Sequence, residues 1–198
     1  MARAGIPMQI TPIDQDNNLF FVADVFPQSL VDQIISTDWL TLPWQRQEGQ
    51  ESWPRRRIDN AALPWNSEWD DCCRELWLAI GNAIGFEVLG YQSSSMYGYD
   101  TAWWLDEPGF TCAMHTDGEM PGAVQMTWIG NANLGTSFYQ YKNSNSLRHQ
   151  FVVSPNTGYI MINRLQPEGY RKLQWHAMLN PVPADQYRIS SYSWITTI

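Results

Sequence analysis

The sequence predicts a mainly β protein with supporting helices (α+β), a double-stranded β-helix or jelly roll with an N-terminal strand and two helices packed on one sheet. Eight short segments of β character follow residue 90, and turns rich in Gly, Pro and Asn separate them. Two stretches with apolar residues at helical spacing come earlier. Many short strands between turns are typical of sandwiches and barrels, and amphipathic helices cover one face of a sheet.

A strand and a helix are expected near the start of the chain. Residues 20–26 are apolar and aromatic, as in a strand, whereas residues 27–35 begin with proline and place Leu30 and Ile34 at helical spacing. Residues 41–64 hold three prolines and several charges without a period. This pattern predicts a long loop.

A second helix is expected over residues 67–84, behind that loop. Its apolar stripe, for which core packing is the simplest role, consists of Trp69, Cys73, Leu76, Trp77 and Ile80. The eight β segments are residues 94–104, 111–115, 124–129, 137–141, 150–153, 159–163, 173–179 and 187–197.

Length and charge limit the classes of protein to consider. The 198 residues are 44% hydrophobic and show no shift in composition, so we expect one domain over 1–198, with 1–90 supporting a jelly-roll core at 91–198. The formal net charge is -8, and an acidic surface repels phosphate backbones. We therefore expect no nucleic-acid partner.

The cysteines and the hydropathy of the chain indicate the cellular compartment in which we expect the protein. Three cysteines without zinc-type spacing cannot form a disulfide framework, which indicates a reducing environment. No apolar run approaches the roughly 20 residues of a membrane span, and the first seven residues lack a signal-peptide core. We expect a cytoplasmic protein without membrane association, either a monomer or a homodimer.

The candidate chemistry centres on His115, Asp117 and His176. His115 and Asp117 are two residues apart, so both project from one face of an extended segment, whereas Cys112 is expected on the opposite face and is excluded as a ligand. Two imidazoles and one carboxylate can hold one face of a divalent iron and leave the opposite positions open. The alternative is a plain hydrogen bond between His115 and Asp117.

A second candidate site lies on the last segment. Alternation places Arg188, Ser190, Tyr192 and Trp194 on one strand face. If this face points inward, Arg188 needs a buried anion, which its planar guanidinium binds through paired hydrogen bonds while Ser190 adds a hydroxyl. An internal salt bridge with a carboxylate is the alternative for Arg188, and both readings stay open.

These motifs, taken in order, resemble those of the iron(II)/2-oxoglutarate-dependent dioxygenase superfamily, nearest its prolyl 4-hydroxylase-like branch. The matching elements are His115–Asp117, residues 135–138, residues 155–162, Trp175–His176 and residues 187–190. The resemblance implies that His115, Asp117 and His176 are catalytic and hold the iron, that Arg188 binds the distal carboxylate of 2-oxoglutarate, and that Ser190 assists. The branch commonly uses a lysine in place of Arg188.

The resemblance also implies the cofactors and the reaction. Fe(II) is the cofactor, 2-oxoglutarate and dioxygen are consumed, and ascorbate serves as a reductant. The products are succinate, carbon dioxide and a hydroxylated amino-acid, peptidyl or other small organic substrate. Members often place a tyrosine before the first ligand to help hold 2-oxoglutarate, and Tyr97, Tyr99 and Gln125 are the candidates for completing this pocket.

The sequence says less about which residues contact the substrate. The 41–64 segment contains Trp44, Trp53 and the run Arg55–Arg57, which suit an anionic or peptide-like substrate or a solvated face. His149 is expected to be solvent exposed. Two alternatives to the dioxygenase stay open: a noncatalytic jelly-roll module that binds a metal or ligand, and an enzyme with a different cosubstrate.

Overall fold

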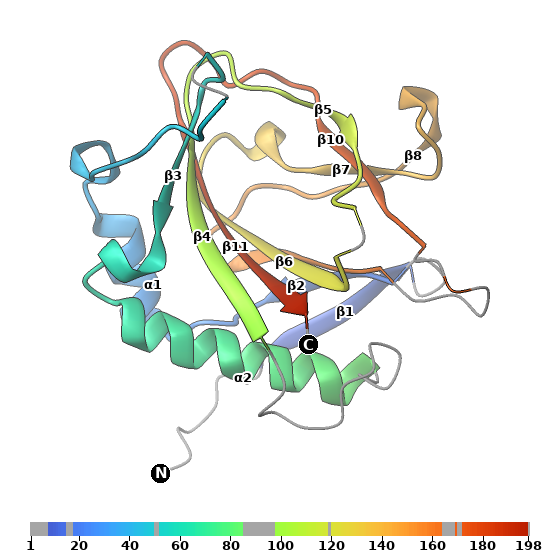
Figure 1. Ribbon diagram of the computed structural model, residues 1–198, viewed down its shortest axis with the longest axis horizontal. Coiled ribbons are helices and arrows are strands. Elements are labelled where there is room, and N and C mark those ends of the chain that lie inside the picture. The colour runs from blue at the N-terminus through green and yellow to red at the C-terminus, as the bar shows by residue number, and fades with distance from the viewer. Residues whose placement is uncertain are drawn as a thin grey trace.

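The computed structural model describes residues 8–14, 18–49, 52–84, 98–118, 120–163, 169 and 172–197. Within these ranges, eleven strands form a seven-stranded and a four-stranded antiparallel sheet, and two α-helices accompany them (Figure 1). The predicted fold class is therefore confirmed, including the N-terminal strand and the two helices on one sheet.

The large sheet has the strand order β1-β2-β9-β6-β11-β4-β3. Its members are β1 (Gln9–Asp14), β2 (Leu19–Ala23), β3 (Arg55–Asp59), β4 (Gly98–Asp106), β6 (Gly122–Ile129), β9 (Thr157–Ile162) and β11 (Arg188–Thr197). The small sheet has the order β5-β10-β7-β8. Its members are β5 (Cys112–His115), β7 (Ser137–Tyr139), β8 (Leu147–Gln150) and β10 (Trp175–Met178). Consecutive strands thus alternate between sheets from β4 to β7, as in a jelly roll.

The two helices, α1 (Gln28–Ser36) and α2 (Asn66–Ile84), cover the outer face of the large sheet (Figure 1). The predicted stripe of α2 is confirmed, since all five of its side chains are at most 1% exposed. Packed indoles fill this interface: the ring centroid of Trp103 lies 4.9 Å from that of Trp39, in a stacked arrangement, and 4.6 Å from that of Trp69, in a tilted one. No helix among the described residues is both long and apolar enough to cross a membrane.

The two faces of β11 separate the helix interface from the space between the sheets. On the outer face, the indole nitrogens of Trp128 and Trp77 donate to the hydroxyls of Ser191 (2.9 Å) and Ser193 (2.8 Å). On the inner face, Tyr192 and Trp194 line a cavity together with Arg188. The predicted alternation along this strand is therefore confirmed.

The expectation of a long loop at 41–64 was wrong in part, because β3 lies within it. Arg55 to Asp59 pair with β4, and short 3-10 turns occur at Trp39–Thr41 and Asn60–Ala62. Three consecutive arginines conceal the strand in the sequence, since a charged run carries no hydrophobic alternation. As the edge strand of the large sheet, β3 pairs with β4, and this pairing directs Arg55 inward (11% exposed) and Arg56 outward (38% exposed).

Smaller differences occur at strand limits. The predicted strand at 150–153 is wrong, since β8 ends at Gln150 and residues 151–153 are not in a strand. Strand β1 was not predicted. His149 is half-buried rather than exposed, with its ring 4.5 Å from that of Phe151.

Gly135 shows why its motif needs glycine. The backbone of Phe151 passes so close that a Cβ at residue 135 would lie 1.5 Å from the Phe151 carbonyl oxygen. The next residue, Thr136, accepts a backbone hydrogen bond of 3.0 Å from Phe151. This close approach brings the Thr136 side chain to the wall of the cavity.

Candidate metal centre

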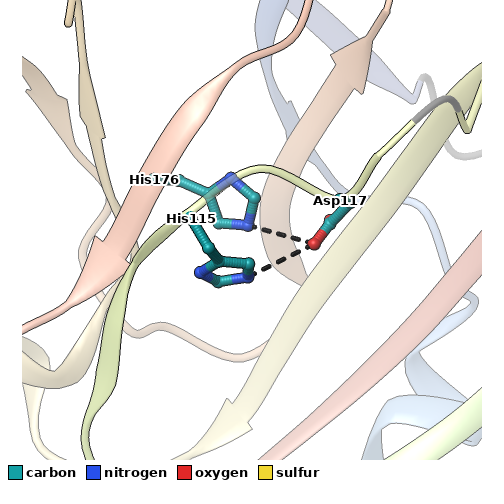
Figure 2. Close-up of side chains that lie close together, drawn as sticks. All are labelled: His115, Asp117 and His176. Atoms are coloured by element: carbon teal, nitrogen blue, oxygen red, sulfur yellow. Dashed lines mark ion pairs between the residues drawn. The ribbon is translucent and has the colours of Figure 1, made fainter. Parts of the chain in front are cut away.

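The three predicted ligands meet between the two sheets. His115 ends β5 and is the direct cross-strand partner of His176 on β10, while Asp117 follows two residues after β5. One carboxylate oxygen, Asp117 Oδ1, lies 3.3 Å from His115 Nε2 and 3.5 Å from His176 Nε2 (Figure 2). The ligand atoms of the three side chains all lie within 4.8 Å of one another, which is close enough to share one ion. We call these residues the His–Asp–His group.

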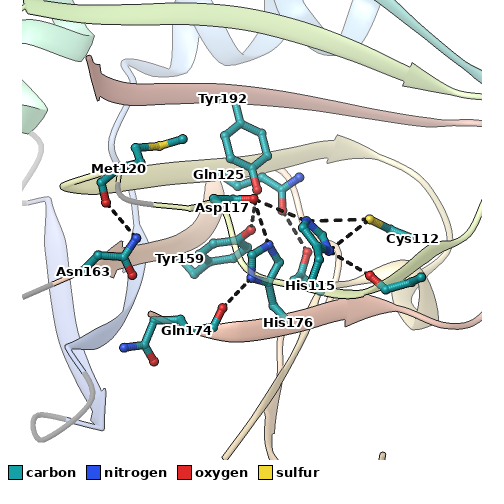
Figure 3. Close-up of polar contacts among 12 residues, drawn as sticks. Cys112, His115, Asp117, Met120, Gln125, Tyr159, Asn163, Gln174, His176 and Tyr192 are labelled. Atoms are coloured by element: carbon teal, nitrogen blue, oxygen red, sulfur yellow. Dashed lines mark hydrogen bonds and ion pairs between the residues drawn. The ribbon is translucent and has the colours of Figure 1, made fainter. Parts of the chain in front are cut away.

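Both imidazole rings are oriented by their own strands. The Nδ1 atom of His115 is 2.8 Å from the carbonyl oxygen of Ala113, and that of His176 is 2.9 Å from the carbonyl oxygen of Gln174 (Figure 3). A carbonyl only accepts, so each Nδ1 carries a proton, and Nε2 is the nitrogen that a metal ion would bind once it is deprotonated. Hydrogen bonds of this kind fix the tautomer and direction of metal-binding histidines.

The donor set fits a divalent ion with open positions. Asp117 Oδ2 is buried and has no hydrogen-bond partner among the described residues, so this carboxylate keeps unused acceptor capacity. Two imidazoles and one carboxylate form the set typical of non-heme iron(II) oxygenases. His176 is buried, whereas the His115 side chain is 40% exposed, which leaves one side of the group accessible.

The group is electrostatically coupled. Burial of Asp117 opposes its ionisation, but hydrogen bonds with His115 and His176 outweigh this cost and hold the pKa of Asp117 well below its usual value. The hydrogen bond to Asp117 is the largest cause that raises the pKa of His115 to about 10. In the metal-free protein, a proton on His115 therefore balances the carboxylate, and a metal ion has to displace that proton.

We expect Asp117→Asn to lower the pKa of His115 in the metal-free protein from about 10 toward its ordinary value of 6.5. A pKa raised in the folded state stabilises the fold below the unfolded-state pKa, and this contribution disappears as pH rises through about 10. Titration of the imidazole proton resonances by NMR measures the change. Asp59→Asn, which changes an exposed carboxylate, is the control, and a wild-type His115 that titrates near 6.5 would contradict the prediction.

Cys112 does not lie on the opposite face from His115 as expected. Its sulfur is 3.6 Å from His115 Nδ1, and it lines the same cavity (Figure 3). The cause is a β-bulge: His115 pairs with His176 and Cys112 with Met178, so three steps along β5 match two along β10. The extra residue turns the thiol toward the side of the imidazole.

A cavity of about 210 Å³ adjoins the His–Asp–His group. The large sheet supplies its opposite wall, where Trp104, Tyr192, Trp194 and Gln125 lie on β4, β11 and β6. Gln125 accepts a hydrogen bond of 2.8 Å from the hydroxyl of Thr136. The predicted contribution of Gln125 to a pocket beside the metal ligands thus agrees with its position.

Two phenols add polar groups near Asp117. The hydroxyls of Tyr159 and Tyr192 are 2.9 Å apart (Figure 3). Burial is the main cause that raises the pKa of each tyrosine, and the negative charge of Asp117 adds to it. Both phenols therefore stay protonated across the physiological range and act as hydrogen-bond donors.

Arg188 is buried and already has a carboxylate partner. Its Nε donates to Asp106 Oδ2 (2.7 Å) and its Nη1 to the carbonyl oxygen of Leu134 (2.7 Å). The structure thus contains the internal salt bridge that was the alternative for this arginine. Arg188 also lines the cavity, and no described residue accepts a hydrogen bond from its Nη2. The salt bridge and an anion-binding role are therefore compatible.

The other residues predicted for the 2-oxoglutarate pocket are Ser190, Tyr97 and Tyr99. Ser190 is fully buried, and its hydroxyl has no partner among the described residues. Tyr97 lies outside the described residues, and Tyr99 is described only as a backbone position of β4 opposite Ile195. Asp106 was missed as a member of the site. Arg55 was considered only within the arginine run on the substrate side, whereas the structure places it at the wall of the cavity beside the His–Asp–His group.

Similarity to known proteins is found in the structure of this chain and not in its sequence. No model of a protein family matches this sequence, and no curated protein matches it either. A Pseudomonas putida prolyl-4-hydroxylase has a TM-score of 0.61 at 13% identity, covering 92% of this chain and 94% of that one. A viral collagen prolyl hydroxylase from Paramecium Bursaria Chlorella virus-1, in complex with 2-oxoglutarate, has a TM-score of 0.61 at 15% identity. The match covers 91% of this chain and 97% of that one.

A third similar structure is a prolyl hydroxylase from Trichoplax adhaerens in complex with a peptide fragment of the hypoxia inducible factor oxygen degradation domain. It has a TM-score of 0.64 at 9% identity and covers 90% of this chain and 83% of that one. Identities this low compare folds rather than activities. The resemblance inferred from the motifs is confirmed at this level: the chain has the fold of the 2-oxoglutarate-dependent oxygenases, with prolyl hydroxylases among its structural neighbours.

Proposed function

We propose that this protein is an iron(II)- and 2-oxoglutarate-dependent oxygenase that hydroxylates an amino-acid, peptidyl or other small organic substrate. The observation that carries the proposal is the position of the His–Asp–His group at one wall of a cavity that is also lined by the buried side chain of Arg188. The group supplies a metal site with open positions, and the arginine supplies an anchor for a carboxylate.

The residues have distinct roles in this reaction. His115, Asp117 and His176 hold the ferrous ion, with both imidazoles aligned by their strand carbonyls. When bound, iron with dioxygen and 2-oxoglutarate supplies the oxidising chemistry: 2-oxoglutarate becomes succinate and carbon dioxide, and the substrate gains a hydroxyl. Ascorbate would serve as the reductant that keeps a bound iron ion ferrous.

Arg188 binds the distal carboxylate of the cosubstrate. Asp106 and the Leu134 carbonyl fix its guanidinium and leave Nη2 for the ligand. Ser190 has an unused hydroxyl on the same strand face and assists. The aromatic side chains of Trp104, Tyr192 and Trp194 limit the entry of water.

A peptide or amino-acid derivative is the substrate class we favour. A structural neighbour, the prolyl hydroxylase from Trichoplax adhaerens, was solved in complex with a peptide fragment, and this supports a peptide as the substrate class. The exposed side of His115 gives a substrate access to the group from outside the cavity. The substrate's identity depends on residues around that opening.

Succinate formation tests the proposal. The protein is incubated with Fe(II), 2-oxoglutarate, ascorbate and air, with and without a panel of free amino acids and peptides, and succinate is measured by mass spectrometry. We expect slow turnover alone, faster turnover with a substrate, and loss of both with EDTA. Metal binding without succinate under any condition would instead support the noncatalytic module.

A further inference from the structure

Three charged residues form a row across three neighbouring strands. Arg188 on β11 is the register partner of Asp106 on β4, and Asp106 is in turn the partner of Arg55 on β3. Arg188 Nε lies 2.7 Å from Asp106 Oδ2, and Arg55 Nε lies 2.8 Å from Asp106 Oδ1. One carboxylate therefore bridges two guanidinium groups, and we call these residues the Arg–Asp–Arg row.

The row carries an excess positive charge in a buried position. The side chains of Asp106, Arg188 and Arg55 are 0%, 3% and 11% exposed. Arginine stays protonated at any working pH, so two cations face one anion. An unbalanced buried charge is costly, and a bound anion would supply the missing counter-charge.

The surroundings of Arg55 do not supply that counter-charge. Its guanidinium carbon lies 4.3 Å from the ring centroid of Trp104 and 4.9 Å from that of Phe110. Aromatic faces attract a cation but carry no net charge. Asp106 is its one acidic partner among the described residues, and Arg55 lines the cavity beside the His–Asp–His group.

The charges of the two ends of the cavity match a dianion. A divalent ion bound by one carboxylate has a net charge of +1, and the Arg–Asp–Arg row has another +1. A dicarboxylate such as 2-oxoglutarate carries −2 near neutral pH. Arg188 alone, paired with Asp106, would present a neutral pair, and the excess charge exists because Arg55 is added.

We propose that Arg55 is a second cation of the carboxylate subsite and acts together with Arg188, while Asp106 positions both guanidinium groups. This inference rests on the proposed function, because it assigns a further residue to the binding of its cosubstrate. It places part of the subsite on a strand that precedes the jelly-roll core. The ligand class is a small dicarboxylate.

The neighbouring arginine offers a matched control. Arg56 projects from the other face of β3, where its side chain is 38% exposed and its guanidinium forms an ion pair of 2.6 Å with Glu107. Arg55→Gln leaves Asp106 and Arg188 as a balanced pair, so this variant is expected to fold. Arg55→Lys keeps the charge and loses the planar fork.

Direct binding of glutarate and 2-oxoglutarate to the metal-free protein, measured by calorimetry, tests the role of Arg55. Glutarate keeps both carboxylates but lacks the keto oxygen. We expect Arg55→Gln to weaken binding of both by about tenfold, the scale of one charge-assisted hydrogen bond, with partial recovery in Arg55→Lys and no change in Arg56→Gln. In turnover, the KM for 2-oxoglutarate should rise about as much and kcat should change less.

The outcomes separate the two proposals. Succinate formation with an unchanged KM and unchanged glutarate affinity in Arg55→Gln would overturn the role of Arg55 and leave the oxygenase proposal standing. Arg55-dependent binding of dicarboxylates without succinate formation would keep the subsite and overturn the oxygenase. Equal weakening in Arg55→Gln and Arg56→Gln, or no binding by the wild type, would also overturn the subsite.

Discussion

In the His176→Ala variant, ferrous ion should bind at least about a hundredfold more weakly, and succinate formation should fall to background. Replacing a residue that only orients a metal ligand typically costs ten- to a hundredfold, and His176 itself supplies one of three ligand atoms. Its loss leaves one imidazole and one carboxylate, too few to retain the ion. Calorimetric titration with Fe(II) under anaerobic conditions and mass spectrometry of succinate measure the two effects.

The third histidine of the chain is the matched control. His149 lies on β8, outside the His–Asp–His group, and its ring contacts Phe151. His149→Ala should keep metal affinity and turnover within about twofold, because the change leaves all three ligands in place. If His176→Ala retained succinate formation at the level of His149→Ala, the assignment of the metal ligands would be wrong.

Asp106→Asn should lower the free energy of unfolding by about 3–5 kcal/mol, the cost of removing one partner from a buried ion pair. The amide is nearly isosteric with the carboxylate, but Arg55 and Arg188 then lie close together without their shared counter-ion. Urea unfolding followed by tryptophan fluorescence measures the change, since the indoles of the helix–sheet interface become exposed on unfolding.

An exposed aspartate provides the comparison for this variant. Asp59 is 72% exposed and pairs with Arg57 at 3.0 Å, so Asp59→Asn should change stability by less than about 1 kcal/mol. A loss of less than 1 kcal/mol in Asp106→Asn as well would mean that water screens the Arg–Asp–Arg row. The excess charge assigned to the row would then no longer require a ligand.

The clustering of the His–Asp–His group could be predicted from sequence because most of its geometry follows from strand periodicity and strand order. His115 and Asp117 share a face through the two-residue period of extended chain, and His176 lies on a segment that the jelly-roll order brings alongside. The inward face of β11 was predicted by the same period. Helix α2 was also recognisable, since its apolar stripe keeps helical spacing over about three turns, from Trp69 to Ile80.

The features that sequence did not reveal depend on pairing between distant strands. The bulge that turns Cys112 toward His115 exists only where β5 meets β10. The partner of Arg188 lies 82 residues earlier, and only the register of β11 on β4 sets Asp106 opposite it. Strand β3 is concealed because its side chains are charged, and its pairing with β4 gives Arg55 a buried position that composition does not indicate.

The carbonyl contacts of the two histidine rings bear on how the proposed site would acquire a metal ion. Each ring is held by the residue two positions earlier in the chain, so the ring orientation is set when the strands pair and does not wait for an ion. Little conformational entropy then remains to be lost at the moment of loading. The binding site is thus rigid before use, and iron should enter or leave a folded protein without a coupled folding step, unlike a zinc finger, whose fold forms around its metal.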